Sequence, residues 1–203
     1  LAYVLMIHDD WTISLTIESI KNKLLDRFYS IYKTAAECFC MSDNMVEYYE
    51  KHTGRKGVVL PPLGQEPVTL NQDRRRTQFL QMGYGGSLHG NYVNNFINTC
   101  HALDRLGGKM TAYTNVSLEH LKGAGLKSDN IEINGFVSSK ELLQRLINMD
   151  ALYLPMDFSE ERKLNMILAF PSKVPDYVML KKPFFVHAPV YSSVVKWASS
   201  PGH

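Results

Sequence analysis

The segment Gly83–Asn91 reads GYGGSLHGN and carries four glycines directly after an apolar run. It leads into a stretch with helical spacing, so it joins a predicted strand to a predicted helix. Glycines at such a turn let backbone N–H groups approach a phosphate, and the start of the helix adds partial positive charge. A tight strand-to-helix turn without a ligand accounts for the same residues, so the loop alone leaves both interpretations open.

The spacing of the loop bears on which phosphate ligand it accepts. A dinucleotide fingerprint needs a third glycine and an acidic residue about 20 positions further on, at the end of the next strand. Here Leu88 stands at the third glycine position, and the next apolar run ends in Tyr113–Asn115 without a carboxylate. A nicotinamide or flavin oxidoreductase is therefore a disfavoured alternative.

A second cluster lies in Phe170–Pro189, which reads FPSKVPDYVMLKKPFFVHAP. Ser172 and Lys173 open a predicted helix that includes Asp176. A lysine in the first turn opposes the helix macrodipole, so we expect an anion nearby, either Asp176 or a bound ligand. In a doubly wound sheet this helix start lies on the same rim as the glycine loop, where such folds bind ligands. Two anion-favouring elements on one rim indicate a diphosphate.

Apolar runs of strand length alternate with amphipathic stretches along the chain, which predicts an α/β fold with a Rossmann-like, doubly wound parallel sheet. The predicted strands are LAYVLMIH, ECFCMS, GVVLPP, QFLQMGYGG, KMTAYTN, IEINGF, ALYLPM and PFFVHAP. Helices are predicted over 17–35, from Ser42 to Gly54, over 93–106, and after the capping box Ser138–Glu141.

The alternation breaks at Pro61–Gln78, a polar stretch with three prolines that predicts an interdomain linker. We expect residues 1–70 to be the end of an N-terminal α/β domain with this linker. Residues 71–203 are expected to form a nucleotide-binding domain that is itself truncated. The apolar opening run without an initiating Met leads us to expect that the chain is cut at both ends.

The composition excludes several functional classes. The chain has 203 residues and a net charge of +2, so no overall field attracts nucleic acid or a membrane surface. We interpret Arg74–Arg76 as a solvated hinge, because no aromatic platform accompanies it. Three cysteines without usual ligand spacing predict neither a zinc site nor a disulfide framework, which favours a cytoplasmic setting. No apolar run approaches the roughly 20 residues of a membrane span.

Taken in order, the segments IHDDW, CMSDNMVEYYEKHTGRKGVVLPP, GGSLHGN, NGFV, DALYLP and FPSKVPDYVMLKKPFFVHAP resemble glycosyltransferase family 4 and its relatives with the GT-B fold. The resemblance covers nearly the whole chain. It implies two Rossmann-like domains facing each other across a cleft, of which the second binds a nucleotide-diphosphate sugar. Most of this chain would be that sugar-donor domain.

The resemblance also implies roles for single residues. Ser172 and Lys173 would belong to the sugar-donor site, with Lys173 neutralising phosphate charge. Asp176 would take the place of the second carboxylate of the family's E-x7-E motif, which binds ribose. In the glycine loop, Gly85, Gly86 and Ser87 would lie beside the diphosphate. In the segment after IEIN, Gly135, Phe136 and Val137 would hold the base.

The chain departs from the family at two points. No E-x7-E motif is present, and Asp157, Glu160 and Glu161 are alternatives for its first glutamate. We take Lys173, Glu160 and Glu161 as the expected catalytic residues. The basic residue that often follows the glycine loop is absent, since His89 and Asn91 stand there.

The implied reaction is retaining transfer from a UDP- or GDP-linked sugar to an acceptor hydroxyl, without metal or cofactor. The acceptor would be a glycan or a lipid-linked glycan, and peripheral docking at the inner face of the membrane is an open alternative. The absent E-x7-E favours a competing interpretation, a nucleotide-sugar-binding module without transfer activity. We expect this chain to bind nucleotide and to transfer nothing by itself.

Overall fold

The computed structural model describes residues 2–9, 18–64 and 79–200 of the chain. Within these ranges, strands and helices alternate and the strands form two parallel sheets, one of three strands and one of five. The α/β class is thereby confirmed, and the arrangement is compatible with a Rossmann-like fold. Each predicted strand is present in the structure, as are the four helices predicted from spacing and caps. None of the described helices is both long enough and apolar enough to cross a membrane.

The strands are β1 (Val4–Ile7), β2 (Glu37–Cys40), β3 (Val58–Val59), β4 (Gln81–Gly85), β5 (Lys109–Tyr113), β6 (Ile131–Asn134), β7 (Ala151–Pro155) and β8 (Phe184–His187). The helices are α1 (Glu18–Thr34), α2 (Asp43–Thr53), α3 (Asn91–Arg105), α4 (Leu118–Gly123), α5 (Ser139–Leu146), the 3-10 turn η2 (Glu160–Arg162), α6 (Lys163–Leu168), α7 (Lys173–Met179) and α8 (Ser193–Ala198).

Contacts divide the chain into two compact units. Unit 1 contains the described residues of Leu1–Leu63, Phe158–Pro171 and Pro189–His203, and unit 2 those of Gly64–Asp157 and Ser172–Ala188. The predicted domain boundary after residue 70 and most of the predicted linker lie outside the described residues.

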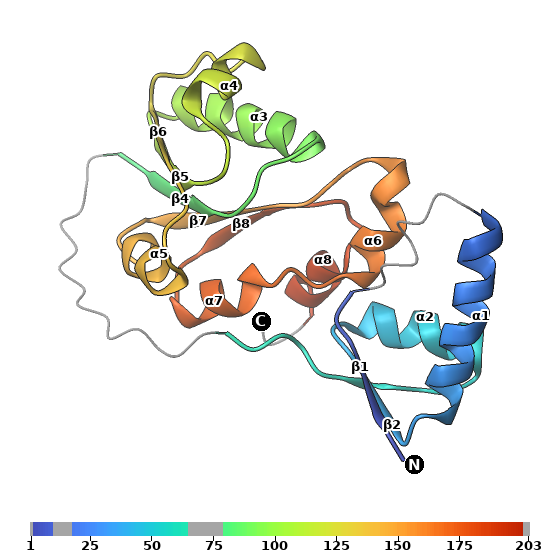
Figure 1. Cartoon of the computed structure of the whole chain (residues 1–203). Helices are drawn as coiled ribbons and strands as arrows, with labels where there is room; N and C mark the ends of the chain where they lie inside the picture. The colour runs from blue at the N-terminus through green and yellow to red at the C-terminus, as the bar shows by residue number, and fades with distance from the viewer. Residues whose placement is uncertain (1, 10–17, 65–78, 201–203) are drawn as a thin grey trace. The chain divides into compact units, whose positions relative to one another are not determined.

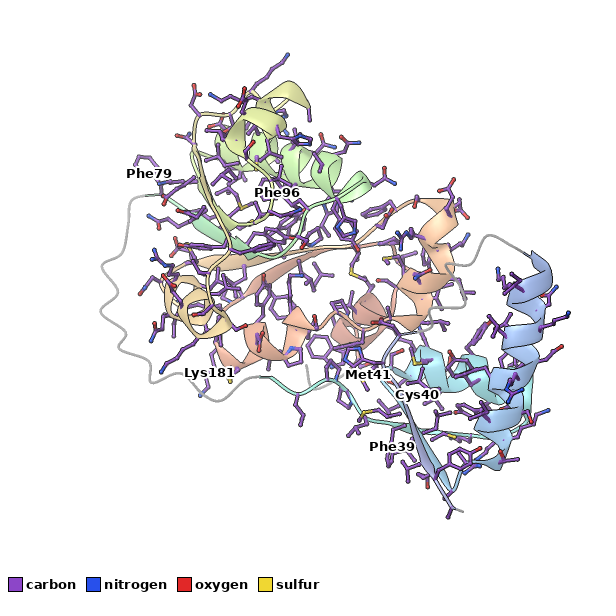
Figure 2. All side chains as sticks on the ribbon, viewed as in Figure 1. Phe39, Cys40, Met41, Phe79, Phe96 and Lys181 are labelled. Atoms are coloured by element: carbon purple, nitrogen blue, oxygen red, sulfur yellow. The ribbon has the colours of Figure 1, made fainter. Side chains whose placement is uncertain are left out.

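Unit 2 is a three-layer structure around the five-stranded sheet. The strand order is β6-β5-β4-β7-β8, and each neighbouring pair is parallel. Helices α3 and α4 cover one face of this sheet, and α5 and α7 cover the other (Figure 1). Phe96 of α3 is fully buried in the core between α3 and the sheet (Figure 2). Helices on both faces are what an all-parallel sheet requires.

The strand order of unit 2 reverses between β4 and β7. From β4 the chain steps outward through β5 to β6, then returns to pair β7 with the other side of β4. The connections that leave β4 and β7 therefore start beside each other and run to opposite faces of the sheet. In open α/β sheets this switch point, at the carboxyl ends of the strands, is where ligands bind.

Unit 1 is built on the sheet β1-β2-β3, in which both neighbouring pairs are parallel. Its core includes a cluster of aromatic rings from α1 and α2, in which Tyr49 lies 5.2 Å from both Phe28 and Tyr32 between ring centroids. Along β2 the side chains alternate, so that Cys40 is buried and Phe39 is partly exposed (Figure 2). Helix α6 packs against both α2 and α8.

Local sequence signals set the ends of the helices as predicted. Ser42 caps α2 by accepting the N–H of Met45, and Gly54 ends that helix with φ +73°, a conformation that glycine adopts without strain. In unit 2, the Ser138 hydroxyl accepts the N–H of Glu141 at 3.3 Å and so caps α5. These short motifs explain why the elements begin and end where the sequence predicts.

Candidate functional site at the switch point of unit 2

The structure brings the glycine loop and Lys173 together. Gly86 follows β4 with φ +145°, and an ideal Cβ atom built there would lie 2.8 Å from Lys173 Nζ. The Lys173 side chain therefore rests on the loop backbone, with its Nζ 5.9 Å from the centroid of the Tyr84 ring. Two segments separated by more than eighty residues meet at the carboxyl end of β4.

Lys173 is a half-buried cation whose charge is only weakly balanced by nearby negative charge. Burial lowers the pKa of its ammonium group, and the Asp176 carboxylate opposes this shift. In the described part of the chain, however, no carboxylate lies within ion-pair distance of Lys173 Nζ. The helix macrodipole of α7 adds a further unfavourable contribution, because Lys173 is its first residue. An anion placed beside Nζ would relieve both costs.

The backbone N–H groups of the loop are only partly used. Gly86 N–H donates to Tyr113 O at 2.9 Å, and Leu88 N–H donates to Asn115 Oδ1 at 2.8 Å. For Ser87 and His89, no acceptor among the described residues pairs with the N–H group. The N–H groups of Ser87 and His89 are therefore available to a ligand, whereas the N–H of Gly86 is already bonded to β5.

Buried tyrosines fix the end of β4. Tyr84 donates its hydroxyl to Ser87 O at 2.8 Å, which ties the strand to the loop. Tyr177 of α7 donates its hydroxyl to Tyr153 O at 3.2 Å, which ties α7 to β7. Burial raises the pKa of each of these phenols. These phenols stay neutral at physiological pH. Their hydroxyl groups serve as hydrogen-bonding groups that hold the end of β4 in place.

Asp157 and Asn91 join the segments that follow β7 and β4 at the switch point. Asp157 follows β7, is 7% exposed, and accepts a hydrogen bond from Asn91 Nδ2 at 3.3 Å. Asn95, one turn further along α3, donates to Met156 O at 3.0 Å. From the sequence, Asp157 is one of three alternatives for the first glutamate, beside Glu160 and Glu161, and Asn91 has no predicted role. Asp157 directly follows ALYLPM, a buried strand, and residues in that position lie at the carboxyl rim of a parallel sheet. This is the sequence signal that favours Asp157 as a site residue.

Gly135, Phe136 and Val137 follow β6 on the same carboxyl rim of the sheet. Strand β6 is the edge strand, two positions from β4 in the strand order. Phe136 is 61% exposed, so a large aromatic ring is available to a flat ligand there. The assignment of this segment to the base stays a prediction.

The remaining predicted site residues are Ser172 in unit 2 and Glu160 and Glu161 in unit 1. Ser172 is exposed and precedes α7 without a side-chain capping bond. Glu160 and Glu161 belong to η2 in unit 1, where the Glu160 carboxylate pairs with Lys163 Nζ at 3.0 Å. Their catalytic roles stay predictions. Arg74–Arg76 lie outside the described residues.

No group of three or more His, Cys, Asp or Glu side chains suited to a metal ion occurs among the residues that the structure describes. The three cysteines are free and buried. In comparisons with known proteins, no family model and no curated protein matches the chain. Function is therefore inferred from the residues of the site itself.

Proposed function

We propose that unit 2 binds a nucleoside-diphosphate sugar, with the diphosphate beside Gly86 and Lys173. We further propose that the protein transfers the sugar to an acceptor hydroxyl, as a GT-B glycosyltransferase does. One observation carries the proposal: a half-buried lysine, with no carboxylate of the described residues within ion-pair distance, lies on a glycine backbone at the switch point. This arrangement suits a dianionic ligand.

The chemistry of sugar transfer gives Lys173 its role. Departure of the nucleoside diphosphate builds negative charge on the phosphate that leaves, and a fixed cation beside it lowers the barrier. Losing one preorganised group of this kind costs about 3 kcal/mol in well-studied enzymes. The loop N–H groups of Ser87 and His89 would add neutral hydrogen bonds to the same phosphates.

A dinucleotide oxidoreductase fits the site less well. Such an enzyme holds the ribose with a carboxylate at the end of the second strand, which here is β5. That strand is followed by Thr114 and Asn115, and Asn115 Oδ1 already accepts from Leu88 N–H and Thr114 Oγ1. A second candidate is a nucleotide-sugar-binding module without transfer activity, favoured by the pairing of Glu160 with Lys163.

A thermal-shift panel tests the proposal. The chain is heated with UDP, GDP and ADP, with their sugars, and with uridine and guanosine as controls that lack the diphosphate. A ligand at 100 times its dissociation constant adds about 2.7 kcal/mol of stability. We expect one nucleoside diphosphate to raise the Tm by several degrees and its nucleoside to raise it little. Equal shifts for nucleoside and diphosphate, or no shift for any diphosphate, would contradict the proposal.

Transfer separates the two candidate functions. Transfer of labelled sugar from the preferred nucleotide sugar to a glycan acceptor by the protein supports the transferase. Tight nucleotide-sugar binding by that protein without any transfer or hydrolysis supports the binding module.

A further inference from the structure

Unit 2 has a pocket of about 520 Å³ between the loop that follows β4 and the loop that follows β5. Its size falls within the range of about 300–1,000 Å³ that is typical of small-molecule sites. One side is apolar and includes Val93 and Val116. The polar side is formed by His89, Asn115, Ser117 and His120.

Each polar side chain of this pocket can donate a hydrogen bond to a ligand. Asn115 Oδ1 already accepts from Leu88 N–H and from Thr114 Oγ1, which leaves the Asn115 amide NH₂ as its unused end. Ser117 Oγ accepts the N–H of His120 at 3.1 Å, which leaves the Ser117 hydroxyl proton to donate. The His120 imidazole is exposed, and no described side chain forms a hydrogen bond with it.

The residues that line the pocket include neither aspartate nor glutamate. The amide, the hydroxyl and the two imidazole groups can each donate a hydrogen bond, and no carboxylate is present to repel an anion. The set therefore suits a ligand that only accepts, such as a carboxylate or a phosphate. Hydrogen bonds to such anions are also the stronger class.

We propose that this pocket holds an anionic group of the substrate, a carboxylate or a phosphate, next to the diphosphate. The proposal rests on the proposed function, because the loop that contacts Lys173 through Gly86 also forms a wall of the pocket through His89. The group comes either from an acidic sugar on the nucleotide or from a separate anionic acceptor. In both cases a carboxylate or a phosphate binds to the same donors of the pocket.

Calorimetry with UDP, UDP-glucose and UDP-glucuronic acid tests the first source. We expect wild type to bind UDP-glucuronic acid about tenfold more tightly than UDP-glucose, the size of one charge-assisted hydrogen bond. His120→Gln, an exposed substitution, should reduce this preference to near unity and leave UDP affinity unchanged. His8→Gln, in unit 1, is the matched control and should keep the preference.

The second source is tested by NMR of the His120 ring while glucuronate or inorganic phosphate is added, with and without saturating UDP. A saturable shift of the His120 signals that is lost in Asn115→Ala supports the pocket. The proposal is overturned if wild type shows no preference for UDP-glucuronic acid and neither anion shifts His120, or if His120→Gln keeps the preference. If none of UDP, GDP and ADP binds, the proposed function fails, and the titrations with the anions alone still decide whether the pocket binds an anion.

Discussion

The Lys173 side chain fills the space that a Cβ atom at Gly86 would need, since an ideal Cβ there would lie 2.8 Å from Lys173 Nζ. Only a residue without a side chain allows the ammonium group to approach the loop backbone this closely. The contact joins the end of β4 to the start of α7, and it defines the place where we expect the diphosphate. Substitutions at Gly86 and Lys173 test this contact, and a nucleotide titration tests its function.

Replacing Gly86 by alanine should lower stability by about 1–3 kcal/mol, because φ +145° strains any residue with a Cβ. The flexible end of the Lys173 side chain must also move aside, which adds little. Chemical denaturation monitored by circular dichroism measures the change. Gly123→Ala is the matched control: it lies in α4 with open space around its Cβ position and should be neutral or stabilising by up to about 1 kcal/mol. Equal effects of the two substitutions would argue against a strained backbone at Gly86.

Lys173→Met should raise the Tm of the nucleotide-free chain near neutral pH. Burial lowers the pKa of Lys173 in the folded state, so the unfolded state binds its proton more tightly and the charge opposes folding. This cost is fully present below the lowered pKa and is relieved as the pH rises from that value towards the ordinary value of about 10.4. The difference in Tm between variant and wild type should therefore shrink on going from pH 7 to pH 10. A difference that grows with pH would have the wrong sign.

Arg55→Ala should destabilise unit 1 by about 1.5–3 kcal/mol, the range for a hydrogen bond from a charged group. The Arg55 guanidinium donates to backbone carbonyls at the end of α1 and just beyond it, including Lys33 O at 3.0 Å and Ala36 O at 2.8 Å. Arg27→Ala, on the exposed side of α1, is the control and should change stability little. Urea denaturation of both variants measures the difference, and similar midpoints would contradict the capping role.

The cysteines should resist thiol reagents in the native chain. Burial raises the pKa of Cys40 to about 11 and that of Cys100 to about 12, and it also raises the pKa of Cys38. Because the thiolate is the reactive form, Ellman's reagent at pH 8 should label the folded chain slowly and label three thiols once denaturant is added. Rapid labelling of any native thiol would contradict the burial of that cysteine.

The sequence predicts the elements well because their signals are local. Apolar runs mark the strands, and Ser42, Gly54 and Ser138 mark helix ends within a few residues. Convergence of the glycine loop with Lys173 follows from a general rule, since parallel strands place their carboxyl ends on one rim. The rule applies to parallel sheets, and the alternation of strands and helices in the sequence predicts a parallel sheet.

What the sequence does not predict depends on contacts between distant residues. The hydrogen bond between Asn91 and Asp157 joins positions 66 residues apart. The use of Gly86 N–H by Tyr113 O depends on the register of β4 with β5. The packing of α6 against α2 brings a late segment of the chain into unit 1. No local period or cap encodes these pairings, because each is selected by the packing of the whole unit.

Calorimetric titration of Lys173→Ala with the nucleoside diphosphate that stabilises wild type most is the most direct test of the central claim. Lys140→Ala, an exposed lysine of α5, is the matched control. We expect Lys173→Ala to weaken binding at least about tenfold, which corresponds to 1.4 kcal/mol, and Lys140→Ala to bind as wild type does. Unchanged affinity in Lys173→Ala, with the fold intact by circular dichroism, would contradict the assignment of the diphosphate to Gly86 and Lys173.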